Sequence, residues 1–269
     1  MHITKENLEI LLDRFGAEAM LYCAANLMDN KRPAMALPLL HFLAEHQPPL
    51  PPEATGDAQE LLALCYENGL GTKKDQEKAF RWIRAAADNG SPMAQLEVAR
   101  YHDPENHICH TSLPKSRDKA MYWYKKAAEG GSVKAMLCLS DVYMGEGDFG
   151  QAQLWLEKAA ARSSPTAVEF LSLALYGGED GFQRDPQKAA AYMRRGMEMG
   201  LPQSYMLYAG YLLESGEEEE MERVVARLAE MVELPIAEVS AAARGDKFSA
   251  RLKKRMMRMQ DEILQKGLE

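Results

Sequence analysis

The sequence predicts an all-α fold built from stacked antiparallel helix pairs, and three independent observations support that prediction. The first is a recurring small residue followed by an amphipathic helix, at steps of 36, 41, 32 and 37 residues. The second is an aromatic residue that recurs in the second helix of the first four units. The third is a glycine-rich turn between helices in most of the units. The unit openings are Ala58, Ala94, Ala135, Ala167 and Ser204, and the aromatics are Trp82, Trp123, Trp155 and Tyr192.

Residues 58–94 form the clearest unit. Its first helix places small and apolar residues at helical spacing on one face, and Gly69 and Gly71 end that helix because glycine tolerates left-handed backbone geometry. Asp75 suits the start of the second helix, where free N–H groups favour a negative oxygen. Trp82, followed by the small pair Ala85-Ala86, makes the inner face of that second helix. One such pair cannot bury both of its faces, so it needs neighbours.

These residues resemble a known repeat. Tyr66-Glu-Asn-Gly-Leu-Gly, Asp75, Lys78-Ala79, Trp82, Ala85-Ala86, Gly90 and Ala94 are similar to the Sel-one-like repeat (SLR), a relative of the tetratricopeptide repeat. The similarity is close in 58–94, good in 167–203 and partial in 94–134 and 135–166. It implies a right-handed superhelical solenoid that binds proteins and scaffolds assemblies. The motif has no catalytic residues, so the resemblance implies no enzyme activity.

We therefore expect three segments. Residues 1–56 hold an N-terminal capping helix, a degenerate helix pair and a proline-rich connector. Residues 57–234 hold the repeat array, with units at about 58–93, 94–134, 135–166 and 167–203 and a partial unit at 204–234. Residues 235–269 depart from the repeat pattern and form a C-terminal capping helix, since an array needs a terminal element to cover its last apolar face.

The N-terminal segment begins with a predicted helix over 4–15. Thr4 is its expected N-cap, and its buried stripe is expected to be Leu8, Leu11, Leu12 and Phe15. Residues 17–46 read as a helix pair without the tryptophan. QPPLPPEATG (47–56) is expected to be an extended spacer, although a proline-rich ligand for another domain is the alternative interpretation.

The second unit carries an insertion, which accounts for its 41-residue step. His102, His107, Cys109 and His110 fall within nine positions, and these residue types are able to bind zinc. Their spacing matches no zinc motif, and His102 occupies a position where other units place a packed aromatic or apolar residue. We therefore expect neither a metal nor a cofactor. If a metal did bind, His107, Cys109 and His110 would be its candidate ligands. We expect the inserted loop to mark a binding edge of the array.

The C-terminal segment is amphipathic and basic. Phe248, Leu252, Met256, Met259 and Ile263 share one side, while the cations Arg251, Lys253, Lys254, Arg255 and Arg258 lie elsewhere. A cap is the favoured interpretation. A helix of this composition also suits docking on a partner or on an anionic membrane surface, and that alternative stays open.

Composition narrows the function classes. The 269 residues carry a formal charge of −8 with a pI near 5.4, which argues against a general nucleic-acid binder because such proteins need a basic surface. No run approaches 18 apolar residues, so no transmembrane segment is expected. The N-terminus lacks the apolar core of a signal peptide. The four cysteines lack paired spacing, so a reduced, cytoplasmic location is expected.

By analogy with tetratricopeptide repeats, residues two, six and nine places after each unit opening should face a concave surface. That surface alternates apolar and acidic groups and predicts a protein or peptide partner with basic and apolar residues. The alternative is that several of these leucines only fill gaps between first helices. The expected residues are Glu60, Leu64, Glu67, Leu96, Arg100, Leu137, Asp141, Met144, Glu169, Leu173, Tyr176, Met206 and Leu213, with Asp103 and Gly210 completing the register.

The sequence thus predicts a non-enzymatic adaptor or scaffold. A more specific variant is an inhibitor or immunity-type protein that clamps a single partner. Helical repeats that read RNA have a similar period, but the acidic positions on the expected concave surface count against RNA. A metal-dependent enzyme built on 102–110 is the last alternative, and no nucleophile–base pair or carboxylate dyad on one face supports it.

Overall fold

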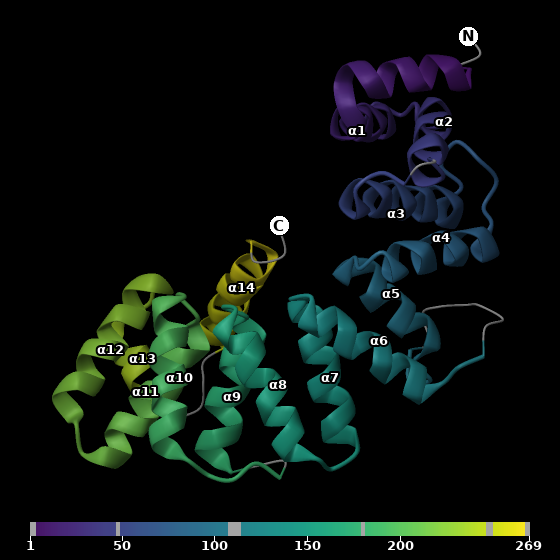
Figure 1. The fold of residues 1–269 in the computed structure, drawn as a ribbon. Coiled ribbons are helices and arrows are strands. Elements are labelled where there is room, and N and C mark those ends of the chain that lie inside the picture. Colours follow the sequence, from purple (N-terminus) through teal and green to yellow (C-terminus); the bar gives the residue numbers. More distant parts are fainter. Residues whose placement is uncertain (1–3, 47–48, 107–113, 179–180, 246–249, 267–269) are drawn as a thin grey trace. The chain divides into compact units, whose positions relative to one another are not determined.

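The computed structural model describes residues 4–46, 49–106, 114–178, 181–245 and 250–266, and all regular secondary structure in these ranges is helical. The all-α prediction is confirmed. The chain divides into two compact units, Met1–Ala135 and Met136–Glu269, each of which is described by itself. Within each unit, consecutive helices pack against one another as pairs (Figure 1).

The first unit is a run of helices in which each contacts the next in sequence from α1 to α6. Its described core includes Leu40, Leu43, Leu62 and Cys65, all fully buried, with Trp82 packed against them while partly exposed. The helices are α1 (Lys5–Asp29), α2 (Pro33–Ala44), α3 (Pro52–Asn68), α4 (Gln76–Asp88), α5 (Pro92–His102) and α6 (Arg117–Glu129).

The N-terminal helix α1 is interrupted at Gly16, whose φ of 79° and ψ of 166° lie outside helical geometry. This break matches the predicted division between a helix over 4–15 and a pair beginning at 17, and the Thr4 side chain caps the helix by accepting from the Asn7 backbone N–H. The predicted buried stripe is only partly right. Leu8 is buried, but Leu11 and Phe15 are 36% and 58% exposed. Helical spacing does not show how much of a face its neighbours cover.

The predicted connector over 47–56 is also partly wrong, because helix α3 begins at Pro52. Proline is well tolerated in the first turn of a helix, where its missing N–H would have no intrahelical partner. Ala54 and Gly56, inside the segment expected to be extended, are buried. The first full repeat therefore starts about one and a half turns earlier than its apolar pattern indicates.

The turn between α3 and α4 depends on glycine. Gly69 ends α3 in the left-handed region, and Gly71 also has a positive φ of 71°. A Cβ atom at Gly71 would lie 2.4 Å from the backbone nitrogen of Ala34, so the turn also packs against α2 without room for a side chain. The Asp75 backbone N–H then donates to the Tyr66 carbonyl over 2.8 Å and closes the turn.

The same capping arrangement recurs at the second helix of four repeats, whereas α12 (Glu218–Met231) follows Glu217 without a side-chain cap. Asp75, Ser116, Asp148 and Asp185 each accept a hydrogen bond from the backbone N–H three residues later. These side chains satisfy N–H groups that the helix itself leaves unpaired, which fixes where each second helix begins. The Asp or Ser that precedes these second helices in the sequence therefore has the same structural role each time, as the N-cap of the helix.

The insertion in the second repeat follows α5, and residues 107–113 lie outside the described part of the chain. His102 is 5% exposed, makes an edge contact with Phe80, and pairs through Nδ1 with the Pro114 carbonyl at 3.3 Å. Burial lowers the pKa of His102 and favours its neutral form. The prediction that His102 is a packed core residue is confirmed.

The second unit begins inside α7 (Val133–Gly145), which spans the division between the units. Leu171, Met193, Leu212, Met221 and Leu228 are among its fully buried side chains. The remaining helices are α8 (Phe149–Ala161), α9 (Pro165–Gly177), α10 (Pro186–Glu198), α11 (Pro202–Ser215), α12 (Glu218–Met231), α13 (Ile236–Ala243) and α14 (Ala250–Lys266).

The last two helices leave the paired order. Helix α13 packs mainly on α12, as the next first helix of the array would, whereas α14 lies against α11. The apolar side of α14 is the one predicted from sequence, with Leu252 and Met256 buried and Met259 and Ile263 half-buried. Phe248 lies outside the described residues. None of the described helices is long and apolar enough to cross a membrane.

Candidate functional site

The predicted surface begins on α3, the first helix of the first repeat. Leu64 is 42% exposed and Glu67 is exposed, whereas Glu60 is half-buried and accepts a hydrogen bond from the Ser91 hydroxyl. Burial raises the pKa of Glu60, and the Ser91 bond opposes that shift. Helix α3 therefore presents one apolar and one acidic side chain to solvent, with a second carboxylate held at the edge.

Helix α5 contributes less open surface. The structure buries Leu96, which is 3% exposed, although the repeat register places it on the concave side. Arg100 is half-buried and pairs with Glu97 of the same helix at 2.7 Å, and Asp103 accepts a hydrogen bond from the Tyr124 hydroxyl at 2.8 Å. The interpretation that some of these residues fill gaps between helices applies to Leu96.

On α7, Leu137 and Met144 are half-buried and Asp141 is exposed. All three positions follow the division between the units and belong to the second one. They continue the predicted alternation of apolar and acidic residues.

The structure brings the α9 and α11 candidates together, because these two first helices contact each other directly. Leu173 is 52% exposed, and Tyr176 and Leu213 are half-buried. Met206 is buried, so, like Leu96, it does not belong to the exposed surface that the register predicts. Gly210 lies opposite Tyr176, since a Cβ atom at Gly210 would be 3.9 Å from the tyrosine oxygen. This pair of helices is the best-defined part of the predicted surface.

A charged cluster lies at the C-terminal end of the α9–α11 surface. Arg184 donates through Nε to the Tyr176 carbonyl at 3.1 Å and pairs with Glu214 at 3.7 Å. Burial, reinforced by the nearby Glu214 carboxylate, raises the pKa of Tyr176 to about 12. Tyr176 therefore stays a neutral phenol, which offers an aromatic face and a hydrogen-bonding hydroxyl.

Glu169 lies near the N-terminal end of α9. Its Oε2 accepts a hydrogen bond from the side-chain amide of Gln260 on α14, whereas Oε1 is buried and has no hydrogen-bond partner among the described residues. Burial raises the pKa of Glu169, and the Gln260 bond only partly offsets that effect. A buried carboxylate with one satisfied oxygen is costly to keep ionised.

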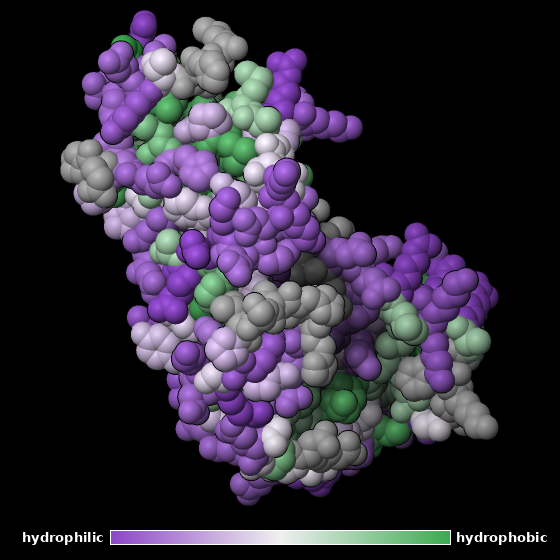
Figure 2. All heavy atoms as spheres, turned by 90° about the vertical axis from the view of Figure 1, so that its right-hand side faces the viewer, coloured by the Kyte–Doolittle hydropathy of each residue, from purple (hydrophilic) through white to green (hydrophobic). Residues whose placement is uncertain are grey.

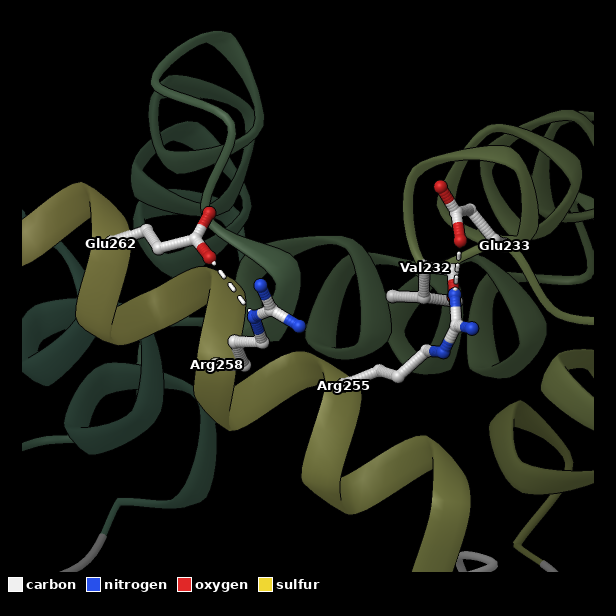
Figure 3. A network of polar contacts seen from close by, with 5 residues as sticks. All are labelled: Val232, Glu233, Arg255, Arg258 and Glu262. Atoms are coloured by element: carbon white, nitrogen blue, oxygen red, sulfur yellow. Dashed lines mark hydrogen bonds and ion pairs between the residues drawn. The ribbon is translucent and has the colours of Figure 1, made fainter.

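Helix α14 is anchored at the end of the array by an arginine. Arg255 donates through Nη1 to the Val232 carbonyl at 2.7 Å and pairs with Glu233 at 2.6 Å. Figure 3 shows Arg255 reaching from α14 to these two residues, while Arg258 pairs with Glu262 of the same helix. The two arginines therefore differ in role, since only the Arg255 contact ties α14 to another element.

Contact between α14 and α11 is incomplete. A hollow of about 420 Å³ lies between the first turn of α11, at Pro202 and Gln203, and Met256, Met257 and Gln260 of α14. Met257 remains 66% exposed. Hydrophobic residues form small patches among hydrophilic ones on the face drawn in Figure 2.

The metal-binding prediction concerns residues that the structure does not describe. His107, Cys109 and His110 all fall within 107–113. Among the described residues, no group of three or more His, Cys, Asp or Glu side chains is arranged to bind a metal ion.

Sequence reasoning missed the contact between Glu169 and Gln260. Repeat register assigns Glu169 to an open surface and gives no role to Gln260, which has no counterpart in the repeat units. One signal was present in the sequence, namely a polar glutamine one turn after Met256 on the apolar side of a basic helix. It does not reveal which residue the glutamine contacts.

Comparison with known proteins adds the family and the fold. The model of the Sel1 repeat matches residues 56–91, 92–132, 136–164 and 165–201, together more than half of the chain. A Sel1 repeat protein from Oxalobacter formigenes has a similar solved structure, with a TM-score of 0.60 and 21% identity over 90% of this chain and 98% of that one.

A second similar structure is c5321, a protective antigen of uropathogenic Escherichia coli with an SLR fold. The TM-score is 0.62 and the identity 17%, covering 97% of this chain and 56% of that one. At these identities the two structures support the fold alone. A comparison with curated proteins found no match.

Proposed function

The chain belongs to the Sel1 repeat family, and from that premise we propose that it is a non-enzymatic adaptor that binds a protein or peptide on the exposed face of its first helices. Sel1 repeat proteins generally mediate protein–protein interaction, and their fold is typically a scaffold without catalytic activity. The partner we propose carries both apolar and basic side chains.

The observation that carries this proposal is the composition of the surface on α9 and α11. Leu173 is 52% exposed on the same helix as the half-buried Tyr176 and Glu169. An exposed leucine beside a neutral tyrosine provides apolar contact area, and tyrosine is enriched among residues that dominate binding energy. The carboxylates at the border of this area favour a basic partner and disfavour an acidic one.

The chain charge supports the same partner class. A net charge of −8 steers cationic partners toward the surface and slows the approach of anionic ones such as RNA. In the first repeat, exposed Leu64 and Glu67 repeat the pairing of an apolar and an acidic side chain on one first helix.

The test begins with capture of partners by the full-length chain, followed by titration calorimetry with each purified candidate. Leu173→Ala and Tyr176→Ala should each weaken binding by about 1–3 kcal/mol, the range expected for central contacts. Asp141→Lys, at an exposed position of α7, should slow association and reduce its dependence on salt.

Matched controls are available on second helices of the repeats that lie in the same compact unit, Met136–Glu269. Leu154 on α8 is 43% exposed, so Leu154→Ala removes the same atoms as Leu173→Ala from a different surface. Glu198 on α10 is exposed, so Glu198→Lys controls for the charge change. If Leu154→Ala abolishes binding and Leu173→Ala leaves it intact, the partner binds the second helices and the proposal is wrong.

A further inference from the structure

Helix α14 differs in charge from the rest of the chain. Residues 250–266 contain six Lys or Arg and two Asp or Glu, a net charge of +4, which leaves −12 for the remaining residues when the whole chain carries −8. The helix nevertheless places Leu252 and Met256 among the buried residues of the second unit. It therefore has the chemistry of the proposed partner, since it is both apolar and basic, and it already lies against a first helix of the array.

Two observations show that α14 only partly pairs the polar groups and only partly covers the apolar groups of α9 and α11. Glu169 is half-buried with Oε1 unpaired among the described residues, and its other oxygen receives only a neutral amide hydrogen bond from Gln260. The hollow of about 420 Å³ between α14 and the start of α11 shows that apolar contact is also incomplete. The hollow is open to solvent, so the cost to stability comes from Glu169, because a buried oxygen without a hydrogen-bond partner destabilises the contact.

The chemistry at Glu169 specifies what would fit better. A lysine ammonium or an arginine guanidinium at the position of Gln260 would neutralise the carboxylate and donate charge-assisted hydrogen bonds, which are about twice as strong as neutral ones. Arginine would also be able to donate to both oxygens at once. The partial burial of Glu169 makes such a pair less screened than a surface ion pair.

We propose that the surface of α9 and α11 covered by α14 is a helix-binding groove, and that its partner is an amphipathic helix with a lysine or arginine where α14 has Gln260. In this arrangement α14 is a resident helix that the partner displaces. The inference rests on the proposed function and narrows it, because it states the secondary structure of the bound segment and the residue that Glu169 selects.

The test uses synthetic peptides that span residues 250–266, labelled for fluorescence anisotropy, with the full-length chain as receptor. One peptide has the native sequence, one carries Gln260→Lys, and a matched control carries Gln265→Lys. Gln265 is exposed, so the control has the same charge and length as the Gln260→Lys peptide. We expect Gln260→Lys to bind on the order of tenfold more tightly than either other peptide, the difference between a charged and a neutral hydrogen bond.

Displacement is measured by hydrogen–deuterium exchange of the backbone amides of α14 in the receptor. The tethered helix competes at a high effective concentration, so the native peptide should bind weakly and open α14 little. The Gln260→Lys peptide should speed exchange in α14. The receptor variant Glu169→Gln keeps the size of the side chain and removes its charge, and it should abolish the tenfold preference.

A second pair of receptor variants keeps the inference testable if peptide affinity is low. Arg255→Ala removes the contacts to Val232 and Glu233, so it should loosen α14 and increase binding of all three peptides by the same factor. Arg258→Ala is the matched control, because Arg258 pairs within α14 at Glu262 (Figure 3). It should leave both the exchange of α14 and the peptide affinity unchanged.

Equal binding of the two lysine peptides would overturn the inference, as would a preference for Gln260→Lys that survives Glu169→Gln. Peptide binding without faster hydrogen–deuterium exchange in α14 would also overturn it. So would a dimer in which two copies of the chain swap their α14 helices. These results leave the Leu173→Ala and Tyr176→Ala test of the adaptor function intact, because neither residue is changed in the peptides or in the receptor variants. Conversely, loss of partner binding in Leu154→Ala but not in Leu173→Ala would contradict the proposed function whatever the peptides do.

Discussion

Gln260 on α14 donates a hydrogen bond to Glu169 on α9, although the two residues lie 91 positions apart in the sequence. The contact joins the segment that follows the repeats to the first helix of the fourth repeat. It leaves Oε1 of Glu169 buried and unpaired among the described residues. Because the contact involves a titratable carboxylate and helix α14, it leads to predictions about the pH dependence of stability and about the role of α14.

The first prediction concerns pH. Burial raises the pKa of Glu169 above its ordinary value of 4.5, so the folded state binds this proton more tightly than the unfolded state does. The stability that protonated Glu169 provides is therefore fully present below the unfolded pKa and is lost as pH rises through the higher folded pKa. Glu169→Gln does not titrate. It should match the wild type near pH 4 and become the more stable protein toward neutral pH.

Urea unfolding from pH 4 to 7.5 measures this difference in the free energy of unfolding. Glu198→Gln, at an exposed position of α10, makes the same chemical change away from α14 and serves as the control. A wild type that gains stability over Glu169→Gln as pH rises would show that the carboxylate is stabilised in the fold, contrary to its burial.

The second prediction compares two glycines inside helices. A Cβ atom at Gly196 of α10 would lie 2.0 Å from the Ser204 hydroxyl oxygen and 2.7 Å from the Ser204 Cβ, where α10 and α11 meet. Gly196→Ala should therefore destabilise the protein by about 1–3 kcal/mol through overpacking. Gly210 of α11 has only the Tyr176 hydroxyl at 3.9 Å, so Gly210→Ala should stabilise by up to about 1 kcal/mol.

Thermal and urea unfolding of both variants decide the second prediction. The chemical change is the same at both sites, so helix propensity alone would give both variants the same sign. If Gly196→Ala were as stable as Gly210→Ala, the close approach of α10 and α11 would be wrong.

The third prediction ranks two tryptophans that occupy equivalent repeat positions. Trp123 is 4% exposed and lies under the Arg84 guanidinium at 4.8 Å, whereas Trp82 is partly exposed and makes an edge contact with His41. Trp123→Ala should cost about 3–5 kcal/mol of unfolding free energy. Trp82→Ala should cost roughly half as much, because less of its surface is removed from water. Urea unfolding curves would contradict this ranking if Trp82→Ala proved the more destabilising.

The fourth prediction concerns the C-terminal cap. A chain that ends at Gly245 lacks Leu252 and Met256, which are buried in the second unit, so it should expose apolar surface around α11 and self-associate. Light scattering and analytical ultracentrifugation measure this change. The double variant Arg251→Ala with Lys254→Ala, at exposed positions of α14, is the control and should remain unaffected. A truncated chain that stays monomeric and equally stable would exclude capping as the role of α14.

Several parts of the fold were predictable because local chemistry specifies them. Asp75, Ser116, Asp148 and Asp185 start second helices, and each accepts from the N–H three residues later, a bond within one turn of chain. Gly69 and Gly71 end a helix through their own backbone geometry. These signals recur with the repeat, so the sequence by itself determined the period, the pairing of helices and the family.

Burial was less predictable, because it depends on neighbours. Leu8 and Phe15 occupy the same predicted stripe, yet Leu8 is 5% exposed and Phe15 is 58% exposed. Leu96 is buried where the register places an exposed residue. Helical periodicity gives the direction of a side chain, and only the packing of adjacent helices decides whether another residue covers it.

Only the tertiary structure decided where α14 packs. The sequence determined that residues 250–266 form an amphipathic basic helix, because that property depends on spacing within the helix. It did not determine that this helix lies against α11 or that Gln260 contacts Glu169, since such a contact depends on the path of the intervening chain. The unpaired oxygen of Glu169 is likewise a property of the assembled second unit. The repeat register places this carboxylate in water, and only the packing of α14 against it encloses it.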